Sequence, residues 1–135
     1  MFGIPGRGDY RMQPVFVEDF AAMTVASVEG NEDVLTDAVG PEIYTFMELL
    51  ETLKMILKSR CLILPLPPTF ALAAAKAIGI LMGDVMLTSD EVKGLMRNLL
   101  VSSRPPSCST RLSEWVRQNA ASVGVRYASE LARRR

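Results

Sequence analysis

The sequence predicts a single mixed α/β domain that is rich in helix and has a few short strands. The length of 135 residues suits one domain, and 49% hydrophobic with 22% charged residues is a globular composition. Several segments carry apolar side chains at the three- and four-residue spacing of a helix. Between them lie short apolar runs bounded by glycine and proline, a pattern typical of strands.

The first part of the chain predicts a lead-in, a strand and a helix. Residues 1–12 are rich in glycine and proline and predict a flexible lead-in without a signal peptide. Residues 13–17 predict a short strand, and Glu18 and Asp19 favour a helix start because carboxylates are stabilised near helix N-termini. Residues 20–28 carry no charge and are apolar on every side, so this helix has to be covered by a further packing layer.

The middle of the chain predicts a second strand and a capped helix. Residues 34–39 are a candidate strand, which Gly40 and Pro41 end. Thr45 and Glu48 have the spacing of a capping box, in which a hydroxyl and a carboxylate each bond a backbone N–H at a helix start. The apolar residues that follow at helical spacing are Phe46, Leu49, Leu50, Leu53 and Leu57.

The last part predicts one strand and three helices. Residues 60–64 predict a short strand, and a proline turn then leads into a helix near Thr69. Further helices are expected after a second capping box at Thr88 and from Leu112 onward. The polar interruptions of residues 69–87 argue against a membrane span. Small residues, which favour close packing in the core, recur in the first of these helices at Ala71, Ala75, Gly79 and Gly83.

Composition excludes several classes of function. Ten acids and two bases lie in residues 1–53, and thirteen bases and five acids lie in residues 54–135, but no basic stripe alternates with aromatic residues. We therefore expect no nucleic-acid partner. The absence of histidine excludes a Ser-His or Cys-His catalytic couple, and two cysteines are too few for the usual zinc sites. The cysteines predict reduced thiols, which indicates a cytoplasmic protein.

Five segments carry a family resemblance, in this order: 13–19 (QPVFVED), 40–46 (GPEIYTF), 64–67 (LPLP), 88–92 (TSDEV) and 112–116 (LSEWV). Together they resemble NAD-dependent epimerase/dehydratase-like proteins of the extended and atypical short-chain dehydrogenase/reductase superfamily. The nearest branch looks like the one that includes a nucleotide-binding accessory subunit of respiratory complex I. Their order and spacing extend the resemblance over most of residues 11–131.

The resemblance implies that the chain is the C-terminal, substrate-side part of a Rossmann-type protein, with the nucleotide-binding half missing. It implies NAD or NADP as the cofactor of the parent protein. The loop Gly3 to Gly8 follows no strand and does not match the family's cofactor-binding glycine pattern, so we expect no cofactor site in this chain. The family's catalytic lysine, four residues after a tyrosine, is replaced after the three tyrosines by Pro14, Glu48 and Leu131. We therefore expect the chain alone to be inert, with no catalytic residue and no metal.

The segment matching residues 11–19 lies near the cleft between cofactor and substrate in the family. The resemblance therefore implies that Arg11 and Gln13 bind substrate through a phosphate or an amide; the alternative is a surface arginine and a strand-edge glutamine. The expected partner is the missing N-terminal Rossmann half, and the isolated chain is expected to pair as a homodimer. Two other functions stay open: a non-catalytic accessory or assembly subunit, and a self-contained helical interaction protein.

Overall fold

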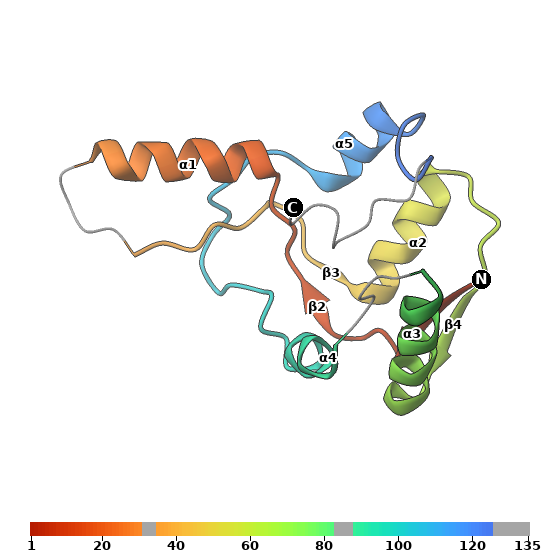
Figure 1. Ribbon diagram of the computed structural model, residues 1–135. Coiled ribbons are helices and arrows are strands. Elements are labelled where there is room, and N and C mark those ends of the chain that lie inside the picture. Colours follow the sequence, from red (N-terminus) through yellow and green to blue (C-terminus); the bar gives the residue numbers. More distant parts are fainter. Residues whose placement is uncertain (31–34, 83–87, 126–135) are drawn as a thin grey trace.

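The computed structural model describes residues 1–30, 35–82 and 88–125, which form a mixed α/β fold, as predicted (Figure 1). Helices dominate these residues, and the strands are short. In chain order the elements are β1 (Phe2–Pro5), β2 (Arg11–Met12), α1 (Val17–Glu29), β3 (Tyr44–Thr45), α2 (Phe46–Ile56), β4 (Ile63–Leu66), α3 (Pro68–Met82), α4 (Ser89–Met96) and α5 (Leu112–Asn119).

Two strands occupy residues 1–12, where the sequence favoured a flexible lead-in. Strand β1 pairs in parallel with β4, and β2 pairs antiparallel with β3. The side chain of Ile4 is fully buried, which ties β1 to the core. Gly6 and Gly8 have φ angles of 70° and 71°, a left-handed conformation that glycine adopts without steric cost. Sheet pairing and the burial of Ile4 therefore override the loop-like composition of this segment.

Two of the predicted strands are wrong in the described residues. Neither residues 13–17 nor the described part of residues 34–39 forms a strand. The backbone N–H of Val39 donates to Ser107 Oγ at 3.0 Å, and its carbonyl accepts from the N–H groups of Ser107 and Cys108. The backbone of this segment is thus bonded to a loop and a side chain instead of a neighbouring strand.

Helix α2 begins with the predicted capping box. The N–H of Glu48 donates to Thr45 Oγ1 at 3.2 Å, and the N–H of Thr45 donates to Glu48 Oε2 at 2.8 Å. These bonds hold the pKa of Glu48 below its ordinary value, chiefly through the Thr45 N–H. Helix α2 packs against α5, and the two helices contribute the buried side chains of Leu49 and Val116.

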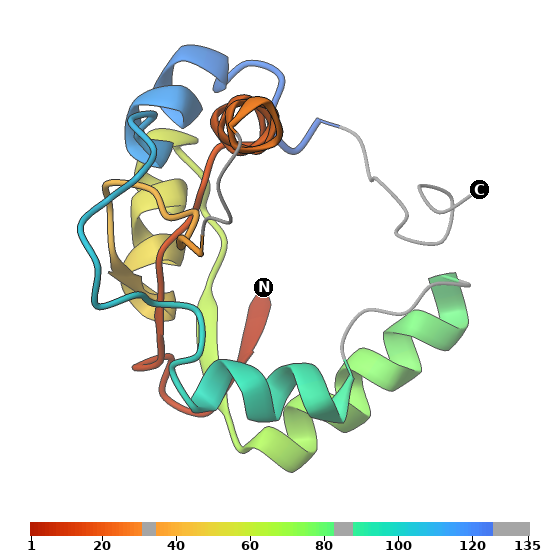
Figure 2. The same cartoon turned by 90° about the vertical axis from the view of Figure 1, so that its left-hand side faces the viewer.

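The strand predicted at residues 60–64 is present as β4, which begins three positions and ends two positions later, and α3 follows after one residue. Helix α3 packs on β1, and of its small residues Ala71 and Gly79 are buried and Ala75 is half-buried, while Ala71 and Ala75 also line a pocket described below. Gly83 lies outside the described residues. Both views place α1 and α5 at one end of the molecule and α3 and α4 at the other (Figures 1 and 2). No helix in the described part of the chain has the length and apolar character needed to cross a bilayer.

Apolar side chains are incompletely covered. Among the described residues, eighteen large hydrophobic residues are exposed and only eight hydrophobic residues are buried. Helix α1 extends away from the rest of the fold in Figure 1, and none of its residues is buried. The uncharged helix that the sequence marked as needing cover therefore lacks cover in this structure.

Candidate functional site

Gln13 joins three segments that are distant in sequence. Its side chain is 8% exposed, its Nε2 donates to the carbonyl of Gly40 at 2.8 Å, and its Oε1 accepts from the N–H of Ser102 at 3.3 Å. The backbone N–H of Gln13 also donates to the carbonyl of Leu100 at 2.9 Å. Both ends of the side-chain amide are thus occupied by protein groups, and Gln13 acts as a buried cross-link.

A cavity of about 550 Å³ adjoins this cross-link, and we call it the Gln13 cavity. Residues 12–15, 37–39 and 99–102 line it. Its polar side chains belong to Gln13, Asp37 and Ser102, and the Ser102 hydroxyl donates to Asp37 Oδ2 at 2.5 Å. The size lies in the range of small-molecule sites, and its hydrogen-bonding groups are chiefly acceptors and backbone groups. No basic side chain lies in the lining.

Arg11 lies beside the Gln13 cavity without lining it. Its backbone N–H donates to Asn98 Oδ1 at 2.6 Å, which fixes the end of β2. The side chain is exposed, and its guanidinium forms no hydrogen bond or ion pair with any of the described residues. The structure therefore brings only Gln13 of the two expected substrate-binding residues to the cavity, and Arg11 lies outside the lining with an exposed side chain.

Sequence reasoning missed two residues that hold the 35–39 segment, part of which lines the cavity. Ser107 Oγ donates to the carbonyl of Asp37 at 2.7 Å, and Arg104 Nη1 donates to the carbonyl of Leu35 at 2.8 Å. These serine and arginine side chains bond to a segment about seventy positions away, so no local pattern reveals the pairing. The SSRPPS run, residues 102–107, signals only an irregular connection.

Asp19 fastens the first turn of α1 to the loop before α5. Its Oδ2 accepts from the N–H groups of Ser109 and Thr110 at 3.0 and 2.9 Å, and its Oδ1 accepts from Thr110 Oγ1 at 2.9 Å. The N–H of Thr110 contributes most to holding the pKa of the Asp19 carboxyl below its ordinary value. The orientation of α1 is thus set at its N-terminal end, although its apolar surface is uncovered.

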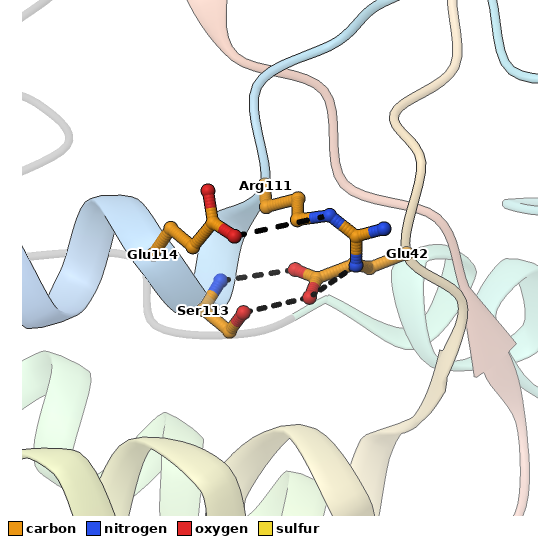
Figure 3. A network of polar contacts seen from close by, with 4 residues as sticks. All are labelled: Glu42, Arg111, Ser113 and Glu114. Carbon is orange, nitrogen blue, oxygen red and sulfur yellow. Dashed lines mark hydrogen bonds and ion pairs between the residues drawn. The ribbon is translucent and has the colours of Figure 1, made fainter.

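Glu42 performs a similar structural task for α5 (Figure 3). Its Oε2 accepts from the N–H of Ser113 at 2.9 Å, and its Oε1 accepts from Ser113 Oγ at 2.7 Å. Arg111 Nη1 lies 3.6 Å from Glu42 Oε1, and Arg111 Nε lies 4.0 Å from Glu114 Oε1. The carboxylate accepts from one of the free N–H groups at the helix N-terminus, that of Ser113, where negative charge is also favoured by the helix dipole.

Opposing effects act on the pKa of the Glu42 carboxyl. Partial burial disfavours its charged form, but hydrogen bonds from Ser113 and Tyr44 and the charge of Arg111 outweigh it, so the pKa of Glu42 lies below its ordinary value. Burial and the neighbouring Glu42 raise the pKa of the Tyr44 phenol. Tyr44 therefore stays protonated at neutral pH and is poorly suited to act as a catalytic base.

Replacing Glu42 with glutamine is expected to lower the free energy of unfolding by about 1–2 kcal/mol at pH 7, because charge-assisted bonds to α5 are lost. The lowered pKa of Glu42 means that its contribution is present above its ordinary value of 4.5 and is lost as pH falls through the folded-state value. Urea unfolding from pH 7 down to pH 3 should show the two proteins converging. Asp90→Asn, which breaks an exposed pair with Lys93, should change stability by less than about 0.5 kcal/mol. An equal Glu42→Gln effect at every pH would contradict this assignment.

The described carboxylates of these networks are engaged in structural bonds. In residues 1–30, 35–82 and 88–125, no group of three His, Cys, Asp or Glu side chains is placed to hold a metal ion. No family model, curated protein or solved structure matches this chain. The family resemblance therefore depends on the five sequence segments named above, and function is inferred from the contacts of the described residues.

Proposed function

We propose that this chain is the substrate-binding portion of an NAD(P)-dependent epimerase/dehydratase-like oxidoreductase and is inert on its own. In this proposal the cofactor, NAD or NADP, binds to a separate Rossmann half that packs against α1. The supporting observation concerns α1. Hydrogen bonds to Asp19 fix the orientation of this helix, and yet none of its residues is buried. The partner layer is proposed to be a Rossmann half because five segments of the sequence, in order, resemble epimerase/dehydratase-like proteins.

The surface of α1 supports a protein partner. Phe20, Val25 and Val28 are 48%, 58% and 79% exposed, while Asp19 holds the start of the helix in place. Burying apolar area of this kind is the main favourable term in protein association. A fixed helix also loses little conformational freedom on binding, so more of that favourable term is retained.

The proposed contribution of the chain to the substrate site is binding. Arg11 offers an exposed guanidinium two positions before Gln13; its charge also acts on Glu48, and guanidinium groups pair well with phosphate. Gln13 supports the wall because both ends of its amide are already bonded. A second candidate is a non-catalytic accessory subunit that docks through the same surface. It is favoured because the carboxylates of Asp19 and Glu42 are engaged in hydrogen bonds that hold helices in place.

The docking test uses the reading frame on the 5′ side of the Met1 codon. We expect it to encode a strand followed by G-x-x-G-x-x-G, and this segment, produced as a separate chain, should bind both NADH and residues 1–135. Val25→Glu should weaken association of the two chains at least about tenfold, because the charge would have to be buried in the interface. Leu62→Glu, at a side chain of matched exposure (57%) away from α1, should leave association unchanged.

Hydrogen exchange and light scattering provide the readouts. The partner segment should protect residues 17–29 from exchange, and the isolated chain should form a dimer that Val25→Glu converts to a monomer. A 5′ frame without a nucleotide-binding pattern would overturn the oxidoreductase proposal. The partner could instead have the nucleotide-binding pattern but no Tyr-x-x-x-Lys, and the complex could show no turnover. That result would favour the accessory-subunit function over the oxidoreductase function.

A further inference from the structure

A second pocket, of about 480 Å³, lies beside α3, the helix at the opposite end of the molecule from α1 (Figure 2). We call it the Tyr10 pocket. It is lined by β1, by one side of α3, and by Tyr10, Phe46, Leu66 and Leu95. Every lining side chain is apolar except that of Tyr10. The volume falls within the range of small-molecule sites, and a lining of this kind selects an uncharged, apolar body.

The phenol of Tyr10 lacks a partner in this wall. Tyr10 is 2% exposed, and its hydroxyl oxygen is buried without a hydrogen bond to any of the residues that the structure describes. Buried hydroxyl groups are nearly always bonded to protein or ordered water, because leaving them unpaired is costly. Tyr10 lines the pocket, but its hydroxyl oxygen is not exposed in it; the hydroxyl is an unused hydrogen-bonding group of a lining residue.

The ring that carries this hydroxyl is held rigidly. Tyr10 stacks on Phe46 with ring centroids 5.3 Å apart, and its carbonyl accepts from the N–H of Phe46 at 2.9 Å. Burial, with a smaller contribution from the Asp9 charge, raises the pKa of Tyr10 to about 12. The phenol therefore keeps its proton at neutral pH and can donate it in a hydrogen bond.

We propose that the Tyr10 pocket binds an uncharged, largely apolar molecule with one carbonyl or hydroxyl oxygen, and that the Tyr10 hydroxyl is its hydrogen-bond partner. An anion would find no cation among the lining side chains. Because the hydroxyl is closed off from water, binding in this proposal requires the apolar side chains that cover it to move aside. No residue of α1 lines the pocket, so this site is separate from the α1 surface on which the Rossmann partner is proposed to dock.

The test compares two probes of similar shape, 2-acetonaphthone and 2-isopropylnaphthalene, of which only the first has a carbonyl. Affinities are measured on the full chain by NMR titration. The ratio of the ketone's affinity to the hydrocarbon's should fall about fivefold in Tyr10→Phe, which removes only the hydroxyl. Tyr44→Phe removes a hydroxyl that already contacts Glu42, and it should leave this ratio unchanged.

Two further results locate the site. Ala74→Trp places a large ring at an exposed lining position of α3 and should weaken both probes at least tenfold while the chain stays folded. Val25→Glu should leave both affinities unchanged. An unchanged probe ratio in Tyr10→Phe, or chemical-shift changes confined to residues 17–29, would overturn the proposal without bearing on the Rossmann partner.

Discussion

Replacing Gly40 with alanine is expected to lower the free energy of unfolding by about 3 kcal/mol or more. A Cβ atom at this position would overlap the carbonyl oxygen of Pro14 and lie 3.0 Å from its carbonyl carbon. Both are backbone atoms, so no side-chain rotation relieves the overlap, and the two crossing segments would have to separate. Separation would also break the bond from Gln13 Nε2 to the Gly40 carbonyl. Urea or thermal unfolding measures the effect.

Gly94→Ala is the matched control for this prediction. Gly94 lies inside α4, and no atom lies within 4 Å of the position that its Cβ would take. Alanine there should raise stability by about 0.5–1 kcal/mol, because it loses less backbone freedom on folding than glycine does. If Gly40→Ala were as stable as the wild type, the close crossing at Pro14 would be refuted.

Replacing Gln13 with methionine is expected to lower the free energy of unfolding by about 2–4 kcal/mol. Methionine has a similar length but cannot bond the Gly40 carbonyl or the Ser102 N–H, and both would be left unpaired in the protein. The three segments that meet at the Gln13 cavity should then separate more easily. Hydrogen exchange at Ser102 is the most direct measurement, because its N–H loses its acceptor.

Arg11→Met distinguishes the structural roles of Arg11 and Gln13, the two residues that were expected from the sequence to bind substrate. The Arg11 side chain is exposed and forms no bond in the described structure, so stability should change by less than about 0.5 kcal/mol. In the complex with the proposed Rossmann half, its loss should affect binding of a phosphate-bearing substrate. An equal loss of stability in Arg11→Met and Gln13→Met would contradict the cross-linking role assigned to Gln13.

Local sequence signals predicted the helices well because their causes are local. The Thr45 and Glu48 side chains satisfy neighbouring N–H groups, and the apolar residues that follow include Leu49, which is buried in the helix that packs against α5. Strand positions were predicted less well. Residues 34–39 have strand-like composition, but a strand needs a partner ladder, and Ser107 supplies the bonds instead.

In the candidate sites, too, some features could be predicted from the sequence and others could not. The sequence pointed to Gln13 but could not reveal that its amide ends at Gly40 and Ser102, 27 and 89 positions away. Tyr10 could be judged from sequence only against a catalytic tyrosine–lysine pattern. Its unpaired hydroxyl and its apolar surroundings are visible only once β1 and α3 are packed beside it.

By itself the sequence determined the mixed α/β class, the helix starts and the uncharged helix that needs cover, because capping, periodicity and hydrophobicity act within a few residues. The tertiary structure alone decided that residues 1–12 form strands, that Gln13 is a cross-link, and that Asp19 and Glu42 anchor helices. Each of these depends on hydrogen bonds or burial between distant segments. Such contacts become favourable only when the chain has closed the intervening loops, so no local pattern encodes them.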